Sequence, residues 1–567
     1  MRLSYLKAIS CPFADLGQWE TGMFNLYCQV RWLVLLAMLA GPSLADDRRF
    51  AGIVSTATPE ASAAGTAILE RGGNAIDAAI AISLALAVSE PAGSGIGGQT
   101  VLLVKATGSD PQVIHGSTLS PAVLPEQVTR EQLTYGHTAS TVPSTLKVLD
   151  LAYRRFGSGK LTWAELVEPA IHLAAQGVAI GSFRARSLSL HGEKLAKNRT
   201  ARDVFYSKDE VPKVGDILRQ PLLARTLVRI AAHGASDFYT GSLAAEIAQD
   251  MTVSGGWITA EDLATFPEPR ITEALRSSYR GFEVFTLPPP FGGWVVLQIL
   301  NILEQFPQSK LAEDDDERRL ALLDAIRIAQ GTRDSDPVSD LRSFSADIAS
   351  KTSKDTARRL LRAYAGKTGG ETTHFSVADA HGNVVAVTQS IDSYFGAKVA
   401  HPSLGFLYNN YMQNFRMVDD GSPFVLKAGE MPLSSMSATI VMRDGSARLV
   451  LGSPGSARII SAVAQVTSHW IDVGAGIEKA VATFRVHSEP DDRAWVEGPQ
   501  LSSDLLGGLA RRGFRLMRSD SSLAVGNLDP YFGGVHALAL ESKGWTGAAD
   551  PRRDGQVSIA WQASDSR

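Results

Sequence analysis

Cysteine is nearly absent from this 567-residue chain. The two that are present, Cys11 and Cys28, both lie within the first thirty residues. The rest of the chain therefore has no disulfide bond, no thiolate zinc site, no iron–sulfur cluster and no cysteine nucleophile. Its folding also cannot depend on the formation of disulfide bonds.

An excess of one charge is missing as well. The chain has 55 Lys and Arg against 59 Asp and Glu, a net charge of −4, so no basic surface for nucleic acid is expected. Its eleven histidines form no H-E-x-x-H pair, and we expect neither a metal nor any other cofactor. No G-x-S-x-G elbow is present. With 44% hydrophobic and 20% charged residues, the composition is that of a globular protein.

The apolar run near the N-terminus is short. Trp32–Leu44 (WLVLLAMLAGPSL) has thirteen residues, whereas a membrane-spanning helix needs about twenty. Small residues follow up to Ala45, where a signal peptidase would cut. We therefore predict a signal peptide over residues 1–45, with a true translation start at Met23, and a periplasmic or secreted protein that leaves the membrane after cleavage. The alternatives are an uncleaved anchor or a buried helix.

A long helical pattern opens the body of the chain. Residues 60–90 predict a helix interrupted at Gly72 and Gly73, and its Ala-, Ile- and Leu-rich second half is typical of a helix buried on most sides. The glycines of 93–98 match G-x-G-x-x-G, but a helix precedes them and a strand-like run, 101–104, follows. A dinucleotide site needs the opposite order. We interpret this cluster as a tight crossing of the backbone.

The character of the sequence changes near residue 372. Helical segments alternate with turns between about 145 and 335, and a basic helical stretch, 351–371, ends the helical part. Residues 372–378 (TTHFSVA) and 384–390 (VVAVTQS) then predict two strands joined by a five-residue turn.

The predicted hairpin brings two hydroxyl groups together. If residue 378 pairs with residue 384, Thr372 lies opposite Ser390, and opposed residues have Cβ atoms about 5 Å apart on one face of the sheet. A slip of one residue would move Ser390 to the other face. The register therefore decides whether these two side chains can act together.

Seven motifs resemble those of the γ-glutamyltransferase family, in the same order and over residues 50 to 555. They are Gly72-Gly73-Asn74-Ala75 with Asp77-Ala78-Ala79, Asp237-Phe238-Tyr239-Thr240-Gly241, Pro288-Pro289-Pro290, Thr372-Thr373-His374-Phe375-Ser376-Val377, Pro432-Leu433-Ser434-Ser435-Met436, Gly452-Ser453-Pro454-Gly455-Ser456 and Asp550-Pro551-Arg552. The resemblance implies an N-terminal nucleophile hydrolase, an α+β protein with four layers in which helices enclose two antiparallel sheets (αββα).

The resemblance also implies that the precursor cuts itself between Glu371 and Thr372. A large subunit, 46–371, and a small subunit, 372–567, would then associate as a heterodimer. Cleavage frees an α-amine whose reference pKa of about 7.7–8.0 lets it act as a base for the neighbouring hydroxyl. An interior threonine has no such base, so cleavage is the activating step.

Further site residues follow from the resemblance by position. Ser390 stands where the family has a threonine hydroxyl that contacts the nucleophile. Gly455 and Ser456 match two glycines whose N–H groups form the oxyanion hole, and serine fits there only if its φ allows it. Ser434 and Ser435 match the serines that contact the α-carboxylate of the substrate.

The substrate-binding residues depart from the family pattern. Ser117 replaces the arginine that grips the γ-glutamyl group, so a bidentate contact to a carboxylate is lost. Asn414 replaces the aspartate that meets the substrate ammonium, Tyr411 replaces a glutamine, and Asp392 replaces an asparagine. The carboxylate has thus moved from position 414 to position 392, where it can take over ammonium binding.

Two enzymatic functions remain open, with Lys398 or Arg416 as substitutes for the missing arginine. In the first, which we favour, Asp392 restores ammonium binding and the enzyme cleaves γ-glutamyl amides such as glutathione-like donors through an acyl-threonine, passing the acyl group to water or to an amino acid or peptide. In the second, the acyl group is of the glutaryl type found in cephalosporin acylases. A non-enzymatic exported binding protein is the alternative outside enzymology, and it would remain one uncut chain.

Overall fold

The computed structural model describes residues 48–206, 210–338, 349–360, 372–519, 523–524 and 526–563. The predicted signal peptide, 1–45, and Glu371 lie outside the described residues. Residues Phe50–Gln562 form one compact unit, called the body below.

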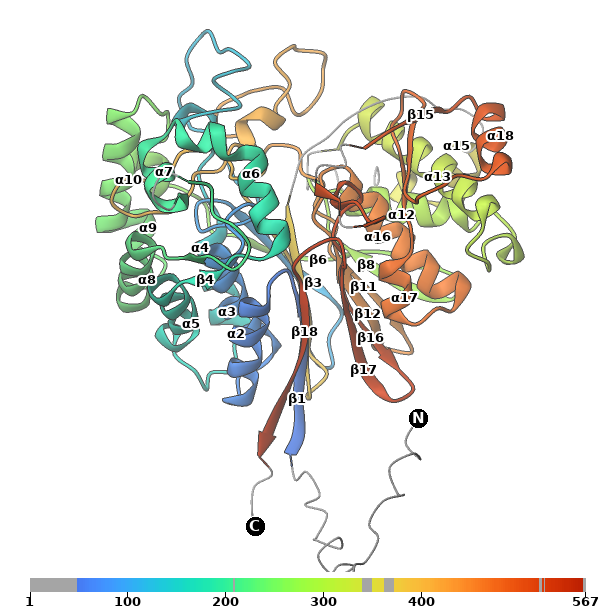
Figure 1. Cartoon of the computed structure of the whole chain (residues 1–567), viewed down its shortest axis with the longest axis horizontal. Coiled ribbons are helices and arrows are strands. Elements are labelled where there is room, and N and C mark those ends of the chain that lie inside the picture. Colours follow the sequence, from blue (N-terminus) through green and yellow to red (C-terminus); the bar gives the residue numbers. More distant parts are fainter. Residues whose placement is uncertain are drawn as a thin grey trace, which may run out of the picture. The chain divides into compact units, whose positions relative to one another are not determined.

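Two sheets form the centre of the body (Figure 1). The seven-stranded sheet has the order β18-β1-β9-β10-β2-β3-β6, built from β1 (Arg48–Thr56), β2 (Gln99–Lys105), β3 (Gln112–Gly116), β6 (Arg270–Glu273), β9 (Thr373–Asp379), β10 (Val384–Ser390) and β18 (Gln556–Ala563). The six-stranded sheet has the order β17-β16-β12-β11-β8-β7, built from β7 (Leu275–Tyr279), β8 (Phe282–Thr286), β11 (Thr439–Arg443), β12 (Ser446–Gly452), β16 (His536–Glu541) and β17 (Gly544–Ala549).

Helices cover the outer face of each sheet, and the inner faces meet in an apolar core (Figure 1). On the first sheet lie α2 (Pro59–Glu70), α3 (Ala75–Ser89) and α4 (Thr145–Phe156), and α5 (Trp163–Gln176) packs against α3. On the second lie α12 (Gly293–Leu303), α16 (Arg458–Ser468) and α17 (Ile477–Ala482), and α13 (Asp316–Ser335) packs against α12. Strands β9 and β10 are buried on both faces because helices cover one face and the second sheet covers the other.

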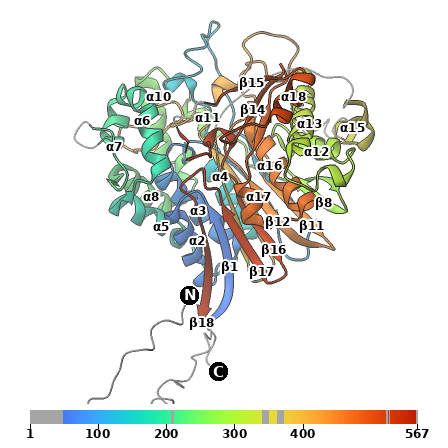
Figure 2. The ribbon, with the colours of Figure 1, turned by 45° about the vertical axis from the view of Figure 1, so that its right-hand side comes forward.

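Smaller elements surround this frame (Figure 2). The helices are η1 (His137–Ala139), α6 (Ser182–Ala196), α7 (Arg199–Phe205), α8 (Pro221–His233), α9 (Asp237–Thr240), α10 (Ser242–Val253), α11 (Ala260–Ala264), η2 (Gln308–Lys310), α15 (Lys354–Leu360), η3 (Tyr411–Asn414), η4 (His469–Val473), α18 (Ser503–Arg511) and η6 (Pro530–Phe532). The short strands are β4 (Val178–Ala179), β5 (Ile217–Leu218), β13 (Val486–Ser488), β14 (Arg493–Val496) and β15 (Arg515–Met517).

The predicted break between the first two helices is confirmed. Asn74 caps α3, and its side-chain oxygen accepts the N–H groups of Ile76 and Asp77. Gly73 packs so closely that a Cβ there would lie 2.7 Å from Ile68 Cγ2. The pair of glycines therefore lets the chain turn sharply between two helices that pack against each other.

The interpretation of the glycine cluster as a backbone crossing is also confirmed. A Cβ on Gly98 would stand 2.1 Å from the carbonyl oxygen of Ser390, and one on Gly97 would stand 2.4 Å from that of Leu407. Only glycine permits this approach, which brings the start of β2 against the end of β10. Within the described part of the chain, no helix is long and apolar enough to span a membrane.

Candidate active site

The hairpin of β9 and β10 has the predicted register. Val384 pairs with Ala378 and the pairing continues to Gln389 with Thr373, so the next pair along the ladder is Ser390 with Thr372. Both residues are buried, with exposed fractions of 4% for Thr372 and 1% for Ser390. The register therefore sets these two hydroxyl-bearing residues one position beyond the last pair of the ladder, near the centre of the seven-stranded sheet.

Ser390 is held by its neighbours. The backbone N–H of Asp392 donates to Ser390 Oγ over 2.7 Å, and the phenol of Tyr411 lies close to Ser390 and Gln99. Burial, with the nearby charge of Asp392, raises the pKa of Tyr411 well above its usual range, so the phenol stays neutral. Tyr411 is therefore part of the wall of the site.

Asp392 and Asn414, the two positions with exchanged residue types, are in direct contact. The side-chain amide of Asn414 donates to Asp392 Oδ1 over 2.8 Å, and the amide of Gln413 donates to Asp392 Oδ2. Asp392 is 4% exposed and has a φ of 78°, in the left-handed region. A carboxylate at either position would thus occupy the same corner of the site. Gln413 was not predicted from the sequence.

Ser117 is linked to Ser434 through Gln99. Ser117 Oγ donates to Gln99 Oε1 over 3.4 Å, and Gln99 Nε2 donates to Ser434 Oγ over 3.5 Å. The carboxamide of Gln99 thus lies between the position of the missing arginine and a predicted substrate-binding serine. Sequence reasoning missed Gln99, although its place directly opposite Ser390 in the β10–β2 ladder is the signal that identifies it.

The predicted oxyanion loop leaves β12 beside the hairpin. A Cβ on Gly452, the last residue of β12, would stand 2.3 Å from His374 Nδ1. Further along, Gly455 has a φ of 120° and Ser456 a φ of 67°. Among the described residues, the N–H groups of these two residues meet no acceptor. Two adjacent, unengaged donors are what an oxyanion requires.

Replacing Ser456 by glycine is expected to stabilise the protein by about 1 kcal/mol. The left-handed φ costs a non-glycine residue roughly 1–3 kcal/mol, which outweighs the roughly 0.4–1 kcal/mol that glycine costs through the unfolded chain. The Ser456 hydroxyl is also buried without a partner in the described structure. Urea unfolding measures the change. The matched control is Ser456→Ala, which keeps the strained φ and should gain less; an equal gain in both variants would contradict the backbone explanation.

His374 and Thr373 are engaged on other contacts. The ring of His374 hydrogen-bonds Thr388 over 3.0 Å and Ser376 over 3.2 Å, and burial holds its pKa well below the ordinary value, so the ring is neutral. Thr373 donates its hydroxyl to the carboxylate of Glu90, just after α3. These hydrogen bonds therefore connect β9 to β10 and to the end of α3.

Lys398 and Arg416 were predicted as substitutes for the missing arginine. Arg416 forms ion pairs with Asp420 over 2.5 Å and with Asp334 over 3.2 Å, so its charge is already neutralised. Burial, together with the charge of Lys194, lowers the pKa of Lys398 to about 8, whereas Asp392 acts in the opposite direction. The ammonium of Lys398 donates to the carbonyl oxygen of Gly396 over 3.5 Å.

Two other family-like motifs, the proline run and the one around Asp550, make contacts within the fold. The carbonyl of Pro290, from the proline run, accepts the N–H of Ser434 over 3.3 Å. Asp550 forms ion pairs with Arg485 over 2.6 Å and with Arg552 over 3.0 Å in the interior. These two arginines keep the pKa of Asp550 low despite its burial. Removing one partner of such a buried ion pair is expected to destabilise the folded protein strongly, because the other charge is left buried and unpaired.

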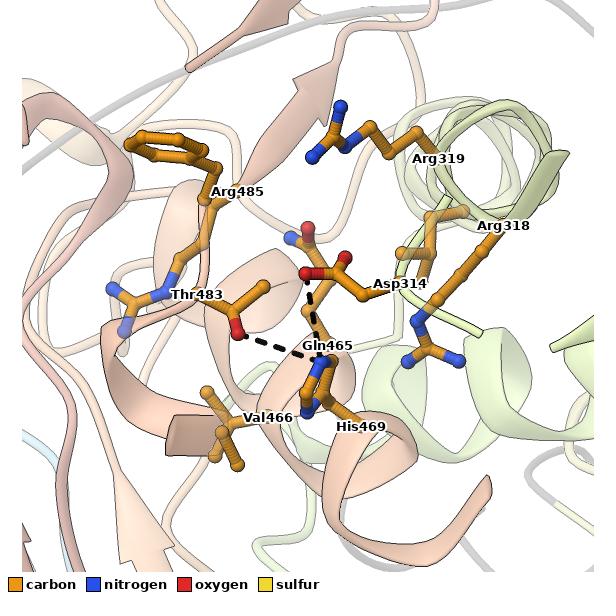
Figure 3. Close-up of a pocket in the computed structure, with 11 residues that line it drawn as sticks. Asp314, Arg318, Arg319, Gln465, Val466, His469, Thr483 and Arg485 are labelled. Carbon is orange, nitrogen blue, oxygen red and sulfur yellow. Dashed lines mark hydrogen bonds and ion pairs between the residues drawn. The ribbon is translucent and has the colours of Figure 1, made fainter. Parts of the chain in front are cut away.

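A small pocket lies in another part of the body (Figure 3). Its volume is about 20 Å³, room for one water molecule. The ring of His469 lies 3.9 Å from Asp314, and the lining residues labelled in Figure 3 are Asp314, Arg318, Arg319, Gln465, Val466, His469, Thr483 and Arg485. None of the predicted site residues lines it. In the described structure, no three His, Cys, Asp or Glu residues are grouped as metal ligands.

Comparison with known proteins shows the family to which the chain belongs. The family model for Gamma-glutamyltranspeptidase matches residues 61–560. The glutathione hydrolase proenzyme of Escherichia coli is 32% identical over 517 residues, which cover 84% of this chain and 88% of that protein. The acylase ACY 1 proenzyme of Pseudomonas sp. strain SE83 is 32% identical over 538 residues, or 89% and 92%. The crystal structure of cephalosporin acylase from Bacillus halodurans matches with a TM-score of 0.80 at 27% identity, covering 90% of this chain and 96% of that one.

Proposed function

Because this chain belongs to the gamma-glutamyltranspeptidase family, whose fold is that of N-terminal nucleophile hydrolases, we propose that it is an amidohydrolase that activates itself by cutting before Thr372. The precursor would yield a large subunit, 46–371, and a small subunit, 372–567, that stay together as a heterodimer. The topology of the seven-stranded sheet supports this association, because β1 and β2 of the large subunit flank β9 and β10 of the small subunit. Removal of the leader, 1–45, would place the enzyme in the periplasm or outside the cell.

Self-cleavage needs only groups of the chain and one water molecule. Thr372 Oγ attacks the carbonyl carbon of residue 371, the peptide C–N bond breaks, and an ester to Thr372 forms while the nitrogen becomes an amine. Water then hydrolyses this ester. The products are a new carboxyl terminus at residue 371 and a small subunit that begins with a free α-amine and a free hydroxyl.

Turnover repeats the same chemistry on a substrate amide. The α-amine of Thr372 accepts the hydroxyl proton, Oγ attacks the amide carbon, and the N–H groups of Gly455 and Ser456 stabilise the developing oxyanion. The proton passes to the leaving nitrogen, and an acyl-threonine remains. Water, in preference to an amino acid or peptide acceptor, then releases the acid and regenerates the hydroxyl.

A γ-glutamyl group is the acyl group that the site supports best. The observation that carries this assignment is the 2.8 Å contact between Asp392 and Asn414, because it puts a carboxylate in the corner where the family binds the substrate ammonium. Ser434 and Ser435 would receive the α-carboxylate. The second possibility is a glutaryl-type acyl group, which is favoured by the serine at position 117 and by the similarity of the fold to a cephalosporin acylase.

Purified enzyme tests both parts of the proposal. Denaturing electrophoresis should show two chains of about 35 and about 21 kDa, in proportion to the 60.6 kDa of the whole chain, and the smaller should begin at Thr372. The mature protein is then assayed with glutathione, γ-glutamyl p-nitroanilide and glutaryl p-nitroanilide in parallel. We expect the γ-glutamyl substrates to have the higher kcat/KM. A higher value for the glutaryl anilide would select the second acyl group, and an uncut chain without activity would refute the mechanism.

A further inference from the structure

Arg333 is a buried arginine whose charge has no direct counterion. It lies in the last turn of α13 and is 6% exposed. Its Nη2 donates to the carbonyl oxygen of Ser434 and to Ser435 Oγ, each over 3.0 Å, and its Nε meets no acceptor. Among the described residues, no carboxylate lies within ion-pair distance of the guanidinium. A buried charge in this situation is costly unless an anion completes its environment.

The two acidic groups whose charges act on Arg333 are engaged elsewhere. Asp334 pairs with Arg416 over 3.2 Å, and Glu489 accepts a hydrogen bond from the ring of His487 over 3.3 Å. Burial lowers the pKa of Arg333 to about 10, and these two carboxylates only partly oppose the effect. The guanidinium is therefore still charged near neutral pH and retains unsatisfied positive potential.

The unsatisfied charge lies directly behind the two serines of the substrate site. Because Arg333 donates to Ser435 Oγ, the oxygen of that hydroxyl is occupied as an acceptor, and its proton is left to donate to a ligand. The bond to the Ser434 carbonyl fixes the backbone between the two serines. This arrangement presents hydroxyl donors backed by a positive charge, which suits a carboxylate.

We propose that Arg333 is the positioning residue that makes the site selective for acyl groups ending in a carboxylate, in place of the arginine that position 117 lacks. It acts through Ser434 and Ser435. The inference rests on the proposed function, and it applies equally to γ-glutamyl and glutaryl groups because both carry this carboxylate. Asp392 would then distinguish these two acyl groups by their ammonium, and Arg333 would distinguish both from neutral acyl groups.

The test compares acids with their carboxamides. The wild type and the variant Arg333→Met are assayed with γ-glutamyl and glutaryl p-nitroanilides and with the matching anilides whose terminal carboxylate is a carboxamide. We expect Arg333→Met to lower kcat/KM for the carboxylates about 100-fold, mainly through KM, and to change it less than about 3-fold for the carboxamides. Arg333→Lys should recover most of the loss. Arg327→Met, on the same helix but paired with Asp324 and Asp492, should leave the acid-to-amide ratio unchanged.

Two further readouts keep the inference separate from folding and from the proposed function. Cleavage into subunits shows that a variant has folded. If Arg333→Met is not cut, Ser435→Ala replaces it, because this change removes only a half-buried hydroxyl. Ser435→Ala must then lose more kcat/KM on the carboxylates than on the carboxamides, by a smaller factor than expected for Arg333→Met. An equal loss on acids and carboxamides would give Arg333 a merely structural role and overturn the inference while the proposed function stands. A wild type that is cut but prefers the carboxamides would overturn it as well. An uncut and inactive wild type would refute the proposed function itself.

Discussion

Replacing Thr372 by alanine is expected to leave a single uncut chain and to reduce amide hydrolysis by a factor on the order of 10⁴ or more. In the proposed mechanism, the substitution removes the hydroxyl oxygen that attacks both the peptide bond before it and the substrate amide. Since the free α-amine arises only by cleavage, the variant loses its nucleophile and its base together. Denaturing electrophoresis and mass spectrometry follow the cut, and release of p-nitroaniline follows turnover.

The neighbouring threonine provides the control for this experiment. Thr373 donates its hydroxyl to the buried carboxylate of Glu90, so Thr373→Ala leaves that group with one partner fewer. We expect this variant to be cut more slowly but to completion, and then to be active. Thr372→Ser keeps an attacking hydroxyl and should also be cut. Normal cleavage of Thr372→Ala, or none at all in Thr373→Ala, would show that the wrong threonine had been assigned.

Replacing Asp392 by asparagine is expected to lower kcat/KM for γ-glutamyl p-nitroanilide about 100-fold. The change removes the negative charge that would meet the substrate ammonium, while an amide of nearly the same shape remains beside Asn414. The glutaryl anilide has no ammonium, so its hydrolysis should be unchanged or faster. Parallel kinetics on the two substrates measure the charge effect, because general damage to the site would reduce both rates.

A double variant tests whether the position of the carboxylate within this corner of the site matters. Asp392→Asn combined with Asn414→Asp returns the carboxylate to position 414, across a contact of 2.8 Å. The charge stays in the same corner of the site, and we expect γ-glutamyl hydrolysis to recover at least tenfold over Asp392→Asn alone. Unchanged kinetics in the single variant would mean that Asp392 does not bind the ammonium, and would favour a different acyl group.

The local parts of the site could be predicted from the sequence. The register of β9 and β10 follows from two runs of β-forming residues and a short turn, so the opposition of Thr372 and Ser390 needed no tertiary information. The glycines at 97 and 98 likewise marked a close crossing before its partner strand was known. Such features depend on neighbours within a few residues, so the local sequence is enough to predict them.

Residues that meet across the fold could not be found in this way. Gln99 reaches Ser434 from 335 positions away, and Arg333 reaches Ser435 from 102 positions away. The sequence also offered Arg416 as a replacement for the missing arginine, whereas the fold pairs it with two aspartates. A charged residue type is visible in the sequence, but its counterion is not.

The sequence by itself determined the strand pairing at Thr372, and its resemblance to the γ-glutamyltransferase family implied the four-layer order and the exchange of residue types at positions 117, 392 and 414. Periodicity, turn residues and motif order are local properties, so they survive without coordinates. Only the tertiary structure decided that Asp392 touches Asn414 and that Arg333 stands uncompensated behind two serines. The reason is that burial and pairing of charge are set by packing between distant segments, and packing is a property of the folded chain as a whole.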